Sequence, residues 1–154
     1  MIETPQIVES TRQDSAAIHV VVPLGEIQQV FPPTVHELLG AMQQQGAAPA
    51  GPLYSYHFQM PTDVFDFDIG FPVAQPVKAA GRMVAAELPK MKVARTIYHG
   101  PMEGIGAAWG ELKDWIAENG LITKTFIWES YLVGPGDTQD ASAWRTQLNW
   151  PLED

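Results

Sequence analysis

The chain repeats one order of sequence signals, and this internal duplication constrains its fold more than any other feature. Three pairs of residues separated by nearly the same stretch of chain mark the repeat: Ile27 with Ile105, Phe31 with Trp109, and Phe71 with Trp150. A period of about 78 residues is too long for a solenoid repeat. We therefore expect two copies of one larger folding unit, with a cleft between them in which a ligand could bind.

Each copy is predicted to have the order strand, helix, strand, strand. The copies span about residues 18–73 and 94–152. Apolar and polar residues alternate in the expected strands, which favours antiparallel pairing over parallel crossovers. The sequence thus predicts an α+β fold in which a curved antiparallel sheet carries two main helices, and the copies are related by pseudo-twofold symmetry.

Local signals give the expected elements in more detail. Pro32 and Pro33 suit the first turn of a helix, where a missing N–H has little consequence. Residues 53–59 and 64–71 are expected to form a hairpin whose turn begins at Met60 and Pro61.

Composition and charge limit the classes of protein. A length of 154 residues fits one domain, residues 1–154, containing both copies. With 18 acidic and 9 basic residues the net charge is -9, which disfavours binding to nucleic-acid phosphates. There is no cysteine, and therefore no disulfide or thiolate metal site. Since no signal peptide or membrane span is recognisable, we expect a cytoplasmic protein with no nucleic-acid or membrane partner.

Four segments of the second copy together resemble the GyrI-like small-molecule-binding domains. They are Tyr98-His99-Gly100-Pro101, the helix through Trp109 and Trp115, Trp128-Glu129-Ser130-Tyr131-Leu132, and Trp144-Arg145-Thr146. Similar domains serve as effector-binding domains of AraC- and MerR-type multidrug regulators. The resemblance covers nearly the whole chain and implies binding of a hydrophobic or cationic small molecule, without a cofactor.

The resemblance also implies which residues would bind the ligand. Glu129 matches the acidic residue at the floor of the family's cleft, and Trp144 matches the aromatic residue at the start of the last strand. Tyr98 and Tyr131 fall on strands that border the cleft. Tyr54 is expected to be the counterpart of Glu129 in the first copy and a candidate for the opposite wall.

Simpler interpretations compete with these roles. An isolated glutamate in a strand is usually exposed, whereas Glu129 has aromatic neighbours that favour a pocket. Trp144 fits a core as well as a cleft. Trp109 and Trp115 lie on the apolar stripe of the second helix and are expected to pack in the core.

No metal site is expected, because the histidines do not have metal-ligand spacing on a helix. The four are His19, His36, His57 and His99. Asp66 and Asp68 share one face of a strand by its period of two, and a solvated face is the favoured interpretation.

Three functions remain open at the level of sequence. The leading hypothesis is a free-standing domain that senses or sequesters hydrophobic, aromatic or cationic molecules, as in drug or toxin resistance. The resemblance to GyrI-like proteins also implies an enzyme as the alternative, a hydrolase of cyclopropane-containing electrophiles, with Glu129 as the base and Tyr98 or Tyr54 stabilising the developing phenolate. The third is a protein-interaction role, such as that of a gyrase inhibitor.

Overall fold

The structure of this chain is a computed structural model that describes residues 1–59 and 62–153. It contains two compact units: unit 1 comprises Met1–Ser10 and the chain from Met91 onward, and unit 2 comprises Thr11–Lys90. The turn predicted at Met60 and Pro61 lies outside the described residues.

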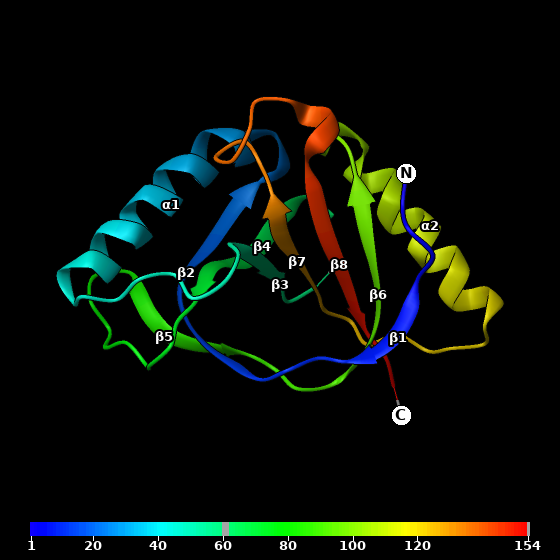
Figure 1. The fold of residues 1–154 in the computed structure, drawn as a ribbon, viewed down its shortest axis with the longest axis horizontal. Helices are drawn as coiled ribbons and strands as arrows, with labels where there is room; N and C mark the ends of the chain where they lie inside the picture. The colour runs from blue at the N-terminus through cyan, green and yellow to red at the C-terminus, as the bar shows by residue number, and fades with distance from the viewer. Residues whose placement is uncertain (60–61, 154) are drawn as a thin grey trace. The chain divides into compact units, whose positions relative to one another are not determined.

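In its described residues, unit 2 has one α-helix and four strands, all paired antiparallel in the order β3-β4-β2-β5 (Figure 1). In chain order the elements are β2 (Gln13–Pro23), the short 3-10 helix η1 (Leu24–Glu26), α1 (Ile27–Gln44), β3 (Tyr54–His57), β4 (Val64–Pro72) and β5 (Met83–Leu88).

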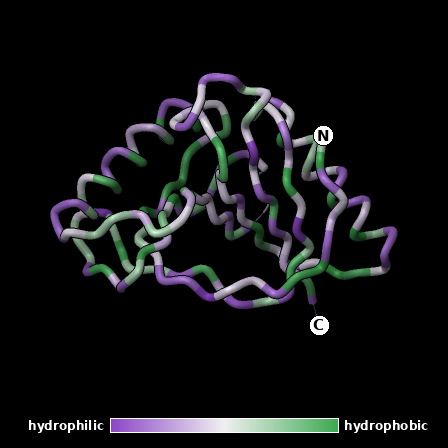
Figure 2. Tube along the Cα trace, viewed as in Figure 1, coloured by the Kyte–Doolittle hydropathy of each residue, from purple (hydrophilic) through white to green (hydrophobic). Residues whose placement is uncertain are grey.

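The core of unit 2 forms where the apolar face of the sheet meets α1. Ile18, Val20 and Val22 alternate along β2 and pack with Leu38 and Met42 of the helix. Figure 2 shows hydrophobic and hydrophilic stretches alternating along α1, as a helix with one buried face requires.

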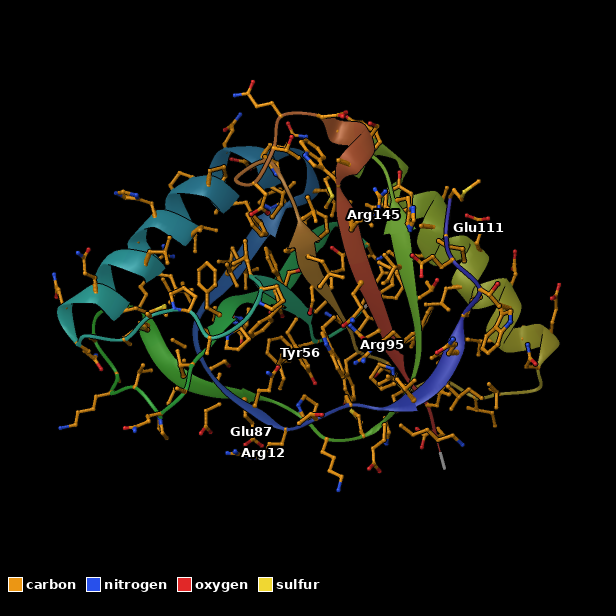
Figure 3. The ribbon with its side chains drawn as sticks, viewed as in Figure 1. Arg12, Tyr56, Glu87, Arg95, Glu111 and Arg145 are labelled. Carbon is orange, nitrogen blue, oxygen red and sulfur yellow. The ribbon has the colours of Figure 1, made fainter. Side chains whose placement is uncertain are left out.

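An ion pair lies at the surface of unit 2, beside the sheet edge formed by β5. There Arg12 Nε lies 2.7 Å from Glu87 Oε2 (Figure 3). Both side chains are about half exposed, so water screens this pair and its contribution to stability is small.

The start of α1 differs from the prediction. The helix begins at Ile27, so Pro32 and Pro33 lie in its interior and not in its first turn. A proline cannot donate to the carbonyl four residues earlier, which leaves the carbonyls of Gln28 and Gln29 without that helical bond. Both glutamines are exposed, and water can satisfy these carbonyls. The interior position is therefore tolerated.

Unit 1, as far as it is described, also has one α-helix and four antiparallel strands, in the order β1-β6-β8-β7. Its elements are β1 (Gln6–Glu9), β6 (Lys92–His99), η2 (Met102–Gly104), α2 (Ile105–Glu118), β7 (Ile127–Val133), η3 (Ala141–Ala143) and β8 (Arg145–Pro151). Ala108, Leu112 and Ile116 of α2 pack on Leu148 and Trp150 of β8.

The two units share the topology of a strand-helix-strand-strand core. The order β2-α1-β3-β4 in unit 2 corresponds to β6-α2-β7-β8 in unit 1, and in each unit a further strand pairs with the first. That strand is β5 in unit 2 and β1 in unit 1. The predicted α+β fold with a duplicated strand-helix-strand-strand unit is confirmed, whereas a single domain spanning residues 1–154 stays a prediction. Within the described residues, no helix is long and apolar enough to cross a lipid bilayer.

Candidate functional site

Glu129 is buried in unit 1 and both of its carboxylate oxygens accept hydrogen bonds. The residue is only 8% exposed. The indole Nε1–H of Trp109 donates to Oε2 at 2.6 Å, and the Tyr131 hydroxyl donates to Oε1 at 2.9 Å. The structure therefore places Glu129 inside the protein, and the alternative of an exposed strand position is excluded.

The period of the strand and the position of the helix bring these three side chains together. In β7, Glu129 and Tyr131 are two residues apart and share the sheet face that carries Ile127 of the core. Trp109 reaches the same face from α2, one turn before Leu112 on the buried stripe of that helix. One face of a strand and one stripe of a helix thus build the site.

Burial dominates the electrostatics of this carboxyl group. Burial raises the pKa of Glu129 above its ordinary value, and the bonds from Trp109 and Tyr131 counteract only part of that effect. No described lysine or arginine forms an ion pair with Glu129. The group can therefore hold a proton at a higher pH than a solvated glutamate, and its charged form has no counterion among the residues that the structure describes.

Tyr98 lies on the same sheet face, but its hydroxyl bonds elsewhere. Tyr98 pairs with Thr146 of β8, which in turn pairs with Tyr131 of β7. The Tyr98 hydroxyl donates to the carbonyl of Pro101 at 2.7 Å, and the side chain is 5% exposed. This hydroxyl holds the turn that leads into η2, so a role in ligand binding or catalysis stays a prediction.

Trp144 lies directly before β8, at the end of η3. Its indole Nε1–H donates to the carbonyl of Thr138 at 2.9 Å, and the side chain is half-buried. Glu129 pairs with Leu148, four residues further along β8, or roughly 13 Å along a strand. The structure thus ties Trp144 to the loop before β8, and its role as a ligand contact stays a prediction.

Tyr54, in unit 2, is buried and already hydrogen-bonded. It is 1% exposed, its ring covers Gly70 of β4, and its hydroxyl lies 2.6 Å from Ser15 Oγ. Burial raises the pKa of Tyr54 to about 12, so its hydroxyl stays protonated at neutral pH. A ligand contact by Tyr54 stays a prediction.

Strand register identifies a different counterpart of Glu129. Glu129 pairs with Leu148 of β8, whereas Ser55 pairs with Ile69 of β4. Leu148 and Ile69 hold the same place, two residues before the aromatic-proline pair that ends each strand. Ser55 is therefore the counterpart of Glu129, and the expected correspondence with Tyr54 is wrong by one residue. Such a slip moves a side chain to the opposite face of the sheet.

The role of Trp109 was not recognised in the sequence. Its position on the apolar stripe predicted a core residue, and it does pack edge-on against Trp150 with ring centroids 5.7 Å apart. A buried indole nevertheless needs an acceptor for its N–H. That requirement, together with an acidic residue on a neighbouring strand, was the signal that could have linked Trp109 to Glu129.

The histidines and aspartates of the described residues form no group of three or more that could hold a metal ion. His19 lies between two aspartates of β4, with Nε2 3.0 Å from Asp66 Oδ1 and Nδ1 2.9 Å from Asp68 Oδ1. The side chains of Asp66 and Asp68 are only 34% and 19% exposed, so the face predicted to be solvated is only partly so.

Several solved structures share the fold. The C-terminal domain of EcmrR superposes with a TM-score of 0.83 at 20% identity, covering 98% of each chain. EcmrR in a complex with DNA superposes with a TM-score of 0.86 at 20% identity over 98% of this chain, which spans 57% of that longer chain.

Two further structures share the fold at lower sequence identity. SAV2435 bound to tetraphenylphosphonium has a TM-score of 0.70 at 10% identity, with 98% of this chain and 94% of that chain covered. A hydrolase from Listeria innocua has a TM-score of 0.70 at 12% identity, with coverages of 97% and 91%. These likenesses show the fold alone.

Sequence comparison identifies the family. No curated protein matches the chain. The GyrI-like small molecule binding domain, in contrast, matches residues 3–153, nearly the whole chain and both copies of the repeat. The chain therefore belongs to the GyrI-like family of small-molecule-binding domains.

Proposed function

We propose that this domain binds hydrophobic aromatic cations and that Glu129 supplies the negative charge that selects them. The observation that carries this proposal is a carboxyl group only 8% exposed, bonded to Trp109 and Tyr131 and without a described cationic partner. A buried charge is costly unless it is paired, and buried carboxylates concentrate at functional sites.

A lipophilic cation should bind at this site more tightly than a neutral molecule of similar shape. It would pair with the Glu129 charge in surroundings of low dielectric constant, where the attraction is stronger than in water. Its apolar groups would contact aromatic side chains such as Tyr131, and aromatic ring faces attract cations. A cation with a small, well-hydrated charge would lose more hydration free energy on entry and bind less well.

Two structural relatives support this ligand class and a regulatory role. SAV2435 binds tetraphenylphosphonium, a bulky aromatic cation, and EcmrR forms a complex with DNA. The proposal for this chain is ligand sensing or sequestration, as in resistance to drugs or toxins. Since the chain spans only 57% of the EcmrR chain, we propose no DNA-binding activity for it.

The experiment compares Glu129→Gln with the wild type, because glutamine keeps the shape of the side chain and removes its charge. Binding of tetraphenylphosphonium, measured by isothermal titration calorimetry, should weaken by about 1–3 kcal/mol, the scale of a hydrogen bond to a charged group. Glu111→Gln is the matched control, because Glu111 lies exposed on α2 and loses the same charge (Figure 3). Equal affinity of Glu129→Gln and Glu111→Gln for tetraphenylphosphonium would show that Glu129 does not contribute to cation binding.

A hydrolase is the second candidate, and the raised pKa of Glu129 favours it. A carboxyl group whose pKa lies closer to neutral pH is a better general base than an ordinary glutamate. In such a reaction Glu129→Gln should reduce turnover by about 10²–10⁴-fold. Incubation with cyclopropane-containing electrophiles, followed by mass spectrometry, tests this function: a ring-opened product that Glu129→Gln fails to form would support it.

A further inference from the structure

Unit 2 contains a buried histidine with an unsatisfied ring nitrogen. His57 is 6% exposed and lies on the α1 face of β3, two residues after Ser55. Its Nε2 lies 3.1 Å from Ser55 Oγ, whereas its Nδ1 is buried and has no hydrogen-bond partner among the described residues. Leaving a buried polar atom unpaired is unfavourable, and native proteins do so rarely.

Both neutral tautomers of His57 leave this nitrogen in need of a partner. If Nε2–H donates to Ser55, then Nδ1 carries an unused lone pair. If the Ser55 hydroxyl donates to Nε2 instead, then Nδ1–H is an unused donor. An amide satisfies either tautomer, because it offers both an N–H donor and a carbonyl acceptor.

Aromatic rings surround the imidazole. The ring of Phe67 stacks on His57 with centroids 4.9 Å apart, and the ring of Phe65 is tilted against it at 5.8 Å. Phe31 of α1 stacks on Phe67 from further away, with centroids 6.2 Å apart. These planar groups favour a flat aromatic partner over an aliphatic one.

The charge state of His57 indicates an uncharged partner. Burial lowers the pKa of His57 to about 4, so the imidazole is neutral at physiological pH. A neutral imidazole offers no counterion to a charged group.

The register relates this histidine to the site in unit 1. His57 pairs with Phe67 as Tyr131 pairs with Thr146, and Ser55 corresponds to Glu129. One copy of the repeat thus carries a carboxyl group at this place, and the other carries a neutral polar pair.

We propose that His57 and Ser55 form a binding position in unit 2 for an uncharged aromatic group that bears an amide or hydroxyl. The His57 Nδ1 makes the hydrogen bond, and the rings of Phe65 and Phe67 contact the aromatic part. This position goes beyond the cation site proposed above and uses none of its residues.

The first test uses the wild-type protein and needs no variant. Imidazole nitrogen resonances are recorded by ¹⁵N NMR while 2-naphthamide is added. The Nδ1 resonance of His57 should move in a saturable manner, whereas that of His36, exposed on α1, should stay in place. A His57 resonance that does not move at saturating probe would overturn the proposal.

The second test compares His57→Phe with the wild type for two probes of similar shape, 2-naphthamide and 2-ethylnaphthalene. Phenylalanine keeps a stacked ring and removes the nitrogens. The affinity ratio of amide to hydrocarbon should fall about tenfold in His57→Phe, the scale of one buried hydrogen bond. It should be unchanged in the control His36→Phe. The same ratio in all three proteins, or no amide binding to the wild type, would contradict the proposal.

Tetraphenylphosphonium is titrated into the same wild-type sample to separate this inference from the proposed function. Cation binding without amide binding would reject only the position at His57. Amide binding without cation binding would reject only the cation site at Glu129.

Discussion

The indole of Trp109 and the carboxyl group of Glu129 are joined by a hydrogen bond of 2.6 Å that connects α2 to β7 within unit 1. This bond lowers the pKa of Glu129 and opposes the larger effect of burial. Trp109 thereby contributes to the core and also controls how readily Glu129 ionises. Its two roles can be separated by experiment.

Trp109→Phe keeps an aromatic ring and removes the N–H donor. The pKa of Glu129 should rise further, and the free energy of unfolding should decrease by about 1–3 kcal/mol, because one buried oxygen loses its partner. Carboxyl ¹³C NMR titration and urea denaturation measure these two changes. Trp115→Phe on the same helix is the control for lost ring volume. Identical effects of both variants on Glu129 would show that the hydrogen bond has no influence.

Cation binding should depend on pH in a direction set by Glu129. Its pKa is raised in the folded protein, so the carboxyl group still holds its proton at a pH where a free glutamate is charged. Binding of tetraphenylphosphonium should therefore strengthen as the pH rises through this raised pKa, and then level off. Calorimetry across the pH range measures it, and Glu129→Gln should remove the dependence. A wild-type affinity that does not change with pH would contradict the prediction.

Because of Glu129, the free energy of unfolding should decrease as the pH rises above the ordinary pKa of a glutamate. Below its ordinary pKa of 4.5 the group is protonated in both the folded and the unfolded chain. Above 4.5 the unfolded chain loses the proton first, so the free energy of unfolding decreases until Glu129 ionises in the folded state as well. Glu129→Gln should be at least as stable as the wild type at neutral pH. Chemical denaturation at a series of pH values checks this, and a clearly less stable variant would contradict it.

His57 should have the opposite dependence, because its pKa is lowered from 6.5 to about 4. The free energy of unfolding should be unaffected by His57 above pH 6.5 and should decrease as the pH falls towards 4, where the unfolded chain binds the proton more readily. The full effect is about 3 kcal/mol at 1.36 kcal/mol per pKa unit. His57→Phe should lose this acid sensitivity, and the exposed control His36→Phe should keep it. Equal acid sensitivity of both variants would contradict the assignment.

The duplicated fold could be predicted because it depends on patterns that recur along the chain. Ile105, Leu112 and Ile116 follow the helical period, and the alternation in β2 follows the period of a strand. The burial of Glu129 could be predicted from its aromatic neighbours in β7 and from the family resemblance, whereas its role as a ligand contact stays a prediction. Each of these signals lies within a single segment of the chain, so it can be recognised without knowing how the segments pack.

The partners of Glu129 could not be predicted in the same way. The bond to Trp109 depends on how α2 packs on the sheet, which no single segment encodes. The counterpart of Glu129 depends on strand register, and the spacing of tyrosines favoured Tyr54 although the pairing of β3 with β4 places Ser55 there. The connection between helix and strand differs in length between the copies, so the offset of 78 residues at the helix starts becomes 74 at Ser55 and Glu129. A match of residues 75 apart is therefore wrong by one residue, which changes the face of the sheet.

The last prediction concerns the contact between Tyr98 and Gly104. The Tyr98 hydroxyl donates to the carbonyl of Pro101, and a Cβ atom added to Gly104 would overlap that hydroxyl. Gly104 has a φ of -92°, which any residue can adopt, so Gly104→Ala introduces no backbone strain and its main expected effect is the steric overlap. The free energy of unfolding should decrease by about 1–3 kcal/mol, the usual result of overpacking.

Two further variants separate this steric effect from a general effect of alanine. Gly110→Ala lies in α2 with nothing near the added Cβ, and should stabilise the protein by about 0.5–1 kcal/mol through helix propensity. Tyr98→Phe removes the hydroxyl that Gly104→Ala would meet. In the double variant the cost of Gly104→Ala should be smaller than in the wild-type background, as a double-mutant cycle in urea can measure. Additive effects would show that Tyr98 and Gly104 are not coupled, and the close packing inferred for this turn would then be wrong.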